Sequence, residues 1–288
     1  MVASKIALAN STKVDSQKST STVIKAKTKF LRFPFFALST KNIHRIDFRE
    51  VTGTRKIAGA EGESKQVDFT YRVSRNTDHV FPGQLSRNIH FALLSIMAKQ
   101  GMKRKNPVQF SWRQLAAEMG VSYSGGRMIR DMKLAIRSTH GTIIRTDQAL
   151  IDGTMAERPT IRRERGLQLY QDYTFHDETR DDGSTCDRNE ITFSDWYFNN
   201  LQARYVQPID FTVWQTLNRK TPIGSRLYEY LTFVFGKQNF RRISYAKLAA
   251  SIPLSEVSEL ARMKRQLTPA LTVLKELKLL KRVNWTTG

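Results

Sequence analysis

Two ten-residue stretches of this chain are nearly alike, and they constrain its fold more than any other feature of the sequence. FSWRQLAAEM covers Phe110–Met119, and ISYAKLAASI covers Ile243–Ile252, 133 residues later. Each stretch reads as a β-type residue, a serine, an aromatic residue and then xxLAAxΦ, where Φ is apolar. Solenoid repeats recur about every 20–50 residues. The much longer spacing found here predicts two copies of one small domain.

The same kinds of segment surround each copy. Around the first lie an apolar helix from Asn88 to about Lys99, a β segment, a helix capped by Ser111, the turn SYSGG, the helix RMIRDMKLAIRSTHG and the strand-like TIIRT. Around the second follow IGSRLYEYLTFVFGKQ, a β segment, a helix capped by Ser244, SEVSELARMKRQLTPALTVLKELKLL and KRVNW. A serine N-cap accepts a hydrogen bond from a free backbone N–H. One copy alone would indicate only a well-capped helix, but two copies with matching neighbours predict helix–turn–helix units.

We therefore predict an α+β fold with two tandem winged helix–turn–helix domains and small antiparallel β-sheets. Residues 1–29 are rich in Ser, Thr and Lys and are expected to form a disordered basic N-terminal tail. Residues 30–207 are expected to form the first winged-helix domain, with β-hairpin additions from HRIDFREV and KQVDFTYRV. Residues 208–288 are expected to form the second winged-helix domain.

The charge of the chain indicates a polyanionic partner. Lys and Arg number 47 against 26 Asp and Glu, a formal net charge of +21 that is spread over the whole length. Such an excess favours nucleic acid, with an anionic membrane surface as the second choice. No apolar run approaches the 18 or so residues needed to cross a bilayer, and the N-terminus lacks the apolar core of a signal peptide. We expect a cytoplasmic protein associated with the nucleoid or a plasmid, with no membrane partner.

The helix that follows the first repeat has one cationic face. Arg127, Arg130, Lys133 and Arg137 lie within about 120° of one another on a helical wheel, opposite an apolar side that includes Met132. Ser124 and two glycines precede this helix, where backbone N–H groups can hold a phosphate. We predict that Ser124 and the four cations contact DNA. The alternative is a solvated charged face.

The helix that follows the second repeat shows the same two-sided pattern. An apolar stripe that begins at Met263 continues through Pro269, which predicts a single helix kinked at the proline. On the outer side, four residues are candidates for base or phosphate contact: Arg262, Lys264, Arg265 and Gln266.

Two loops have contrasting charge. ERPTIRRERG, over Glu157–Gly166, occupies the place expected for a wing, and its Arg158, Arg162 and Arg163 are candidates to follow a DNA backbone. A solvated loop is the alternative. DETRDDGSTCD, over Asp177–Asp187, is acidic and is expected to be a hairpin tip that stays away from DNA.

The sequence contains no pattern typical of catalysis or of cofactor binding. Its five histidines are scattered without an HEXXH motif, and no glycine-rich nucleotide-binding motif occurs. The single cysteine, Cys186, excludes an internal disulfide and a cysteine-built zinc site. We expect a protein that is not an enzyme and that has no cofactor and no metal. An enzyme that nicks or unwinds DNA is the alternative.

Several segments resemble the replication initiator protein A family in content and order. They are FLRFPFFALSTK, VFPGQLSRNIHFALLSIMAKQG, VQFSWRQLAAEMG, ITFSDWYFNNLQARYVQPIDFTVWQTL, GSRLYEYLTF and MKRQLTPALTVLKEL, within Lys29 to Val283. The most specific parts are Trp196–Asp210, Arg226–Tyr228 and Leu267–Leu271. The resemblance implies tandem winged helices that bind directly repeated origin sequences (iterons) in double-stranded DNA and open the origin. It also implies recruitment of host replication proteins, such as a helicase loader or initiator, and autorepression as a self-dimer.

The predicted function is therefore initiation of replication of a plasmid or related replicon. A winged-helix transcriptional regulator without a replication role is the alternative. The sequence given ends at Gly288, soon after KRVNW, so we expect the second domain to have at most a stub of a wing. No sliding-clamp motif stands out.

Overall fold

The computed structural model describes residues 5–10, 23–27, 33–39, 41–58, 64–100, 106–147, 164–176, 188–202, 206–236, 238–254 and 259–286. The chain divides into two compact units. The terminal unit contains residues 1–34 and 207–288, and the central unit contains residues 35–206. Both units combine helices with small antiparallel sheets, which confirms the α+β class.

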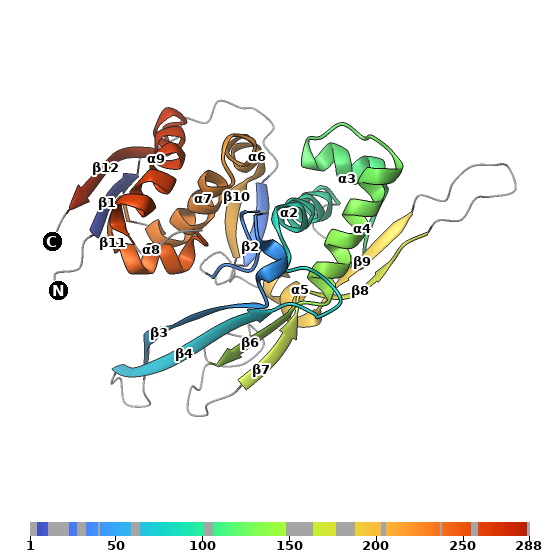
Figure 1. Cartoon of the computed structure of the whole chain (residues 1–288), viewed down its shortest axis with the longest axis horizontal. Coiled ribbons are helices and arrows are strands. Elements are labelled where there is room, and N and C mark those ends of the chain that lie inside the picture. Colours follow the sequence, from blue (N-terminus) through green and yellow to red (C-terminus); the bar gives the residue numbers. More distant parts are fainter. Residues whose placement is uncertain are drawn as a thin grey trace, which may run out of the picture. The chain divides into compact units, whose positions relative to one another are not determined.

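The central unit contains two sheets and four α-helices among its described residues (Figure 1). Its elements are η1 (Ile43–Arg45), β3 (Phe48–Ala58), β4 (Ser64–Ser74), α2 (Gln84–Lys99), β5 (Val108–Phe110), α3 (Trp112–Met119), α4 (Gly126–His140), β6 (Ile143–Asp147), β7 (Glu164–Gln168), β8 (Tyr170–Thr174), β9 (Asn189–Phe193) and α5 (Asp195–Gln202). One sheet has the order β3-β4-β6-β7, and the other has the order β5-β9-β8.

Helix α2 forms the centre of the central unit's core because it is apolar on nearly every side. It packs against α3 and α4, and its Ile89, Leu93 and Ile96 are buried with Leu115 of α3 and Ile136 of α4. A helix that is apolar all round needs cover on several faces, which the two shorter helices provide.

The terminal unit joins segments from both ends of the chain. Its elements are β1 (Lys5–Asn10), β2 (Val23–Lys27), β10 (Val206–Asp210), α6 (Phe211–Lys220), α7 (Pro222–Phe235), β11 (Phe240–Ser244), α8 (Tyr245–Ser251), α9 (Leu260–Glu276) and β12 (Leu280–Thr286). One sheet has the order β11-β1-β12, and β10 pairs with β2 in a second.

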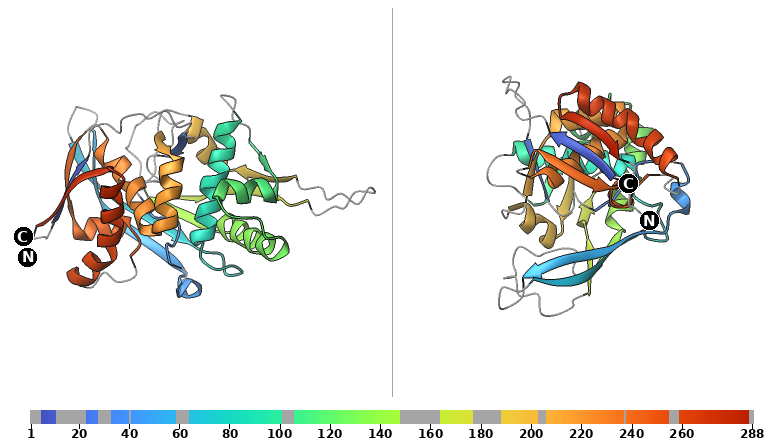
Figure 2. Two further views of the ribbon diagram at one scale, coloured as in Figure 1. Left: turned by 90° about the horizontal axis from the view of Figure 1, so that it is seen from above. Right: turned by 90° about the vertical axis from the view of Figure 1, so that its left-hand side faces the viewer.

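The expectation that residues 1–29 are disordered is wrong for Lys5–Asn10 and Val23–Lys27. Strand β1 lies between β11 and β12 and runs antiparallel to both (Figure 2). Its Ile6 and Leu8 are fully buried. The sheet of the second domain therefore has a complete third strand instead of a stub, and this strand comes from the opposite end of the chain.

The structure confirms the serine caps of the two repeats. Ser111 Oγ accepts a hydrogen bond from the backbone N–H of Gln114 at 3.0 Å, and Ser244 Oγ accepts one from that of Lys247 at 3.4 Å. The aromatic residue after each serine, Trp112 or Tyr245, is buried. The two repeats therefore form matching helices with the same side facing the core.

The duplication extends to the helix before each repeat. Helix α2 buries the pair Ser86–Arg87 in its first turns, and α7 buries the pair Ser225–Arg226 at the equivalent place. Arginine is seldom fully buried in proteins unless it is paired. Its burial in both helices is an independent sign that the two units share one plan.

Candidate nucleic-acid interface

Helix α4 has one open face that carries two of the predicted arginines. Arg127 and Arg130 are exposed, whereas Met132 and Ile136 on the other side are fully buried. Leu134, also on the open face, is 49% exposed. The predicted division of the helix into a buried and a cationic side is confirmed for these residues.

Lys133 and Arg137 lie at the edge of that face. Both side chains are partly buried because they turn toward the aromatic residues of α3 and β8. Lys133 Nζ lies 5.8 Å from the ring centroid of Trp112 and 5.6 Å from that of Phe175, and the Arg137 guanidinium lies 5.9 Å from the latter. Cation–π attraction accounts for this direction. The expectation that all four cations share one open surface is therefore wrong, and α4 presents Arg127 and Arg130 most openly.

The turn before α4 adds two residues to this surface. Ser124 and Tyr123 are exposed, and the guanidinium of Arg113 on α3 lies 5.5 Å from the Tyr123 ring centroid. Gly125 has a φ of +85°, a conformation that other residues rarely adopt, so a glycine is needed for α4 to begin here. Arg113 was missed because it lies inside the repeat, although it follows the buried Trp112 and so points outward.

In the terminal unit, α9 holds the equivalent candidates. The structure confirms a single helix that runs through Pro269. Arg262 and Arg265 are exposed, and Arg262 Nε also lies 3.1 Å from a carboxylate oxygen of Glu259. Gln266 is partly buried, and its side-chain amide donates to the Arg262 carbonyl at 3.5 Å.

Lys264 occupies the place in α9 that Lys133 occupies in α4. Lys264 Nζ lies 5.5 Å from the ring centroid of Trp285 in β12. That indole stacks on Tyr245, with centroids 5.5 Å apart and planes 2° apart. In the central unit, Trp112 likewise lies beside Phe175, at 5.3 Å. Each unit therefore places a lysine over an aromatic residue that packs against the first residue of its repeat helix.

The basic loop Glu157–Gly166 does not lie where we expected a wing. It connects β6 and β7, which belong to the β3-β4-β6-β7 sheet. The strand before α3 is β5, which pairs with β9 of the β8–β9 hairpin. The hairpin that shares a sheet with the helix–turn–helix segment is thus the one with the acidic connection. Arg158, Arg162 and Arg163 lie outside the described residues, as do residues 177–187.

The sheet of the terminal unit adds cations that the sequence analysis did not single out. Arg242 and Asn284 flank Ala7 of β1, and Phe240 and Arg282 flank Ala9. Both arginines are exposed, as is Lys281. Their place on one sheet depends on β1, so they could not be grouped from the sequence.

A buried ion pair ties the helices of the terminal unit together. Arg226 donates to Glu229 at 2.9 Å and to the Ser251 carbonyl at 3.2 and 3.1 Å. Glu229 also accepts from the indole N–H of Trp214 at 2.7 Å. Arg226 thereby satisfies a carbonyl at the C-terminal end of α8. The specific triplet Arg226–Tyr228 thus has a structural role in holding the repeat helix in place.

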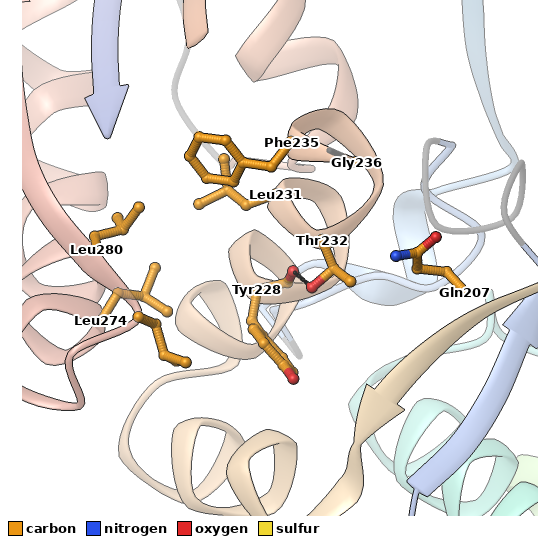
Figure 3. Close-up of a pocket in the computed structure, with 9 residues that line it drawn as sticks. Gln207, Tyr228, Leu231, Thr232, Phe235, Gly236, Leu274 and Leu280 are labelled. Atoms are coloured by element: carbon orange, nitrogen blue, oxygen red, sulfur yellow. Dashed lines mark hydrogen bonds between the residues drawn. The ribbon is translucent and has the colours of Figure 1, made fainter. Parts of the chain in front are cut away.

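A pocket of about 180 Å³ lies in the same unit (Figure 3). Its lining is mainly apolar and consists of Gln207, Tyr228, Leu231, Thr232, Phe235, Gly236, Leu274, Leu279 and Leu280. Burial raises the pKa of Tyr228 to about 12, and its hydroxyl oxygen accepts from the Asp210 backbone N–H at 3.2 Å. A phenol with so high a pKa stays protonated at neutral pH. The lining residues provide no nucleophile with an adjacent base.

Two wider searches bear on other kinds of site. Among the residues that the structure describes, no three His, Cys, Asp or Glu side chains gather where they could hold a metal ion. Within the same residues, no helix has both the length and the apolar character needed to span a membrane.

The fold has counterparts among solved structures. A crystal structure of domains 2 and 3 of RctB matches with a TM-score of 0.56 and 12% sequence identity, over 86% of each chain. A second crystal structure of RctB domains 2–3 matches with a TM-score of 0.50 and 11% identity, over 83% of this chain and 80% of that one. No protein-family model and no curated protein matches the sequence. The likeness to RctB therefore concerns the fold, and the resemblance to the replication initiator protein A family depends on the segments quoted above.

Proposed function

We propose that this protein is a sequence-specific binder of double-stranded DNA that initiates replication of a plasmid or related replicon. Each unit would act as a winged helix, with α4 and α9 entering major grooves at repeated origin sequences. Binding would promote opening of the origin, recruit host replication proteins and, through a self-dimer, repress the protein's own promoter. The protein would act in the cytoplasm without enzymatic activity of its own.

One observation carries this proposal. The chain builds the same capped helix, followed by a helix with a buried apolar stripe and exposed arginines, in both units. Arginine on an open helix face suits both phosphate contact and bidentate recognition of guanine. Two readers on one chain suit a site of about two helical turns of DNA.

The fold favours an initiator over a transcriptional regulator. RctB, whose domains 2 and 3 share this fold, is a replication initiator. The match extends over both units, as does the resemblance to the replication initiator protein A family. A transformation assay tests this choice: a replicon that is maintained without this gene would rule out the initiator role.

Footprinting on DNA that flanks the protein's own gene tests sequence recognition. We expect protected direct repeats. Arg127→Ala or Arg265→Ala should each weaken specific binding by roughly 1–3 kcal/mol if the arginine reads a base. Arg45→Ala provides a charge-matched control, because Arg45 is exposed on η1 outside both helix–turn–helix segments. Normal binding by both helix variants would show that α4 and α9 are not the reading helices.

Two further measurements separate the proposal from its alternatives. With about 6–10 phosphate contacts, affinity for duplex DNA should fall roughly 10³–10⁵-fold between 50 and 200 mM salt. A supercoiled plasmid incubated with the protein and Mg²⁺ should stay supercoiled. Relaxed or nicked product would instead indicate an enzyme.

A further inference from the structure

The β3-β4-β6-β7 sheet of the central unit has an open face with an ordered set of side chains. Two rows cross all four strands. The first row contains Phe48, Ser74, Ile143 and Gln168, and the second contains Glu50, Arg72, Arg145 and Gly166. Side chains alternate between the two faces of a strand, so these residues share one side. We call them the outer sheet face.

The outer sheet face is uncovered, whereas the opposite face belongs to the core. Phe69, Tyr71 and Ile144, which point the other way, are buried. On the outer sheet face, Phe48 is 48% exposed and Ile143 is 39% exposed. Large apolar side chains on the open side of a half-buried sheet are a sign of a binding surface when they lie beside charged groups.

The charges on this face indicate an anionic partner. Arg72 and Arg145 are directly opposite each other on β4 and β6. Like charges in that position destabilise a sheet unless something neutralises them. Glu50 approaches Arg72 only to 3.9 Å, and within the described part of the chain no carboxylate pairs with Arg145. A bound phosphate would remove this repulsion.

Phe48 and Arg72 form a stacked pair on the same face. The Arg72 guanidinium carbon lies 3.7 Å from the centroid of the Phe48 ring. The contact orders the ring while leaving about half of the residue open to solvent. Nucleobases stack on aromatic rings and on guanidinium planes, and this stacking does not depend on base identity.

We propose that the outer sheet face binds single-stranded DNA, with an unpaired base stacked at Phe48 and Arg72 and the adjacent phosphates at Arg145. Duplex DNA is a poorer ligand, because its bases are already stacked on each other and a flat sheet enters neither groove. The face is therefore distinct from the duplex contacts of α4 and α9. The inference goes beyond the proposed function and does not require it.

A second copy of the chain is the other partner to consider for an exposed sheet face. Symmetric contact would bring two sets of Arg72 and Arg145 together on molecules that each carry a net charge of +21. Charge complementarity therefore favours a polyanion. The alternative is retained as an outcome of the experiment below.

Fluorescence anisotropy with labelled oligo(dT) of about 20 nucleotides tests the proposal, beside titrations with duplex DNA and measurement of the oligomeric state by ultracentrifugation. Phe48→Ala should weaken oligo(dT) binding about 5- to 150-fold, the range found for loss of one base–aromatic stack. Phe48→Trp should restore binding. Arg145→Ala should also weaken it and should reduce its dependence on salt. Neither Phe48→Ala nor Arg145→Ala should change duplex binding.

Arg127→Ala on α4 is the reciprocal control. It should leave oligo(dT) binding unchanged, whatever it does to duplex binding, so failure of one proposal can be separated from failure of the other. Unchanged oligo(dT) binding by both Phe48→Ala and Arg145→Ala would overturn the inference. A shift from dimer to monomer in these variants, with oligo(dT) binding intact, would also overturn it and would assign the face to self-association.

Discussion

The role of strand β1 leads to a sharp prediction about residues outside both helix–turn–helix segments. Leu8 is fully buried on the middle strand of the terminal sheet, opposite Arg241 on one side and Val283 on the other. Replacing a buried leucine with alanine costs about 2–5 kcal/mol, because transfer free energy is lost and a cavity is left. Leu8→Ala should therefore destabilise the terminal unit by that amount, against a typical domain stability of about 5–15 kcal/mol.

Removal of residues 1–10 should have a larger effect than the point substitution. It takes away Ile6 and Leu8 together, and it leaves β11 and β12 without the strand that pairs with both. Burial of the two side chains alone is worth roughly 3–6 kcal/mol. We expect the terminal unit to be largely unfolded or only marginally stable in the truncated protein, with α9 no longer able to bind DNA.

Urea unfolding followed by tryptophan fluorescence measures the effect of either change, because Trp285 on β12 pairs directly with Ile6. Ala9→Ser is the matched control, since Ala9 is only partly buried and points away from Leu8. A truncated protein with an unchanged unfolding midpoint and normal duplex binding would refute the reasoning, because β1 would then contribute nothing to this sheet in solution.

Two more predictions concern buried polar groups. Arg226→Ala should destabilise the terminal unit by about 3–5 kcal/mol in urea unfolding, since it leaves the buried Glu229 carboxylate without its cation. Lys275→Ala, on an exposed position of α9, should change stability by less than about 0.5 kcal/mol, and an equal loss in both variants would contradict this account. Burial lowers the pKa of His90 to about 3, while its ring contacts the Tyr197 hydroxyl at 2.9 Å. The folded state therefore binds fewer protons than the unfolded state below about pH 6.5, so the unfolding free energy should fall by roughly 2 kcal/mol between pH 7 and pH 5. His90→Gln should lose that part of the pH dependence, and identical pH profiles for the two proteins would refute it.

Local patterns were sufficient to predict the helices that matter for the proposed function. Serine caps act within a few residues, and an apolar stripe of helical period needs no knowledge of the partner that buries it. The capped helices after Ser111 and Ser244 and the uninterrupted helix through Pro269 were predicted for this reason. The exposed positions of Arg127 and Arg265 follow from the same periodicity.

Long-range pairing decided the remaining features. A six-residue strand has little stability alone, so the alternation of Ile6 and Leu8 acquires meaning only when β11 and β12, more than 200 residues away, pair with it. Which hairpin joins the sheet of β5, and that Arg72 faces Arg145, likewise depend on strand register. The sequence alone therefore determined the two reading helices, while the tertiary structure decided the sheets that support them, because sheet pairs form between segments that the chain does not place next to one another.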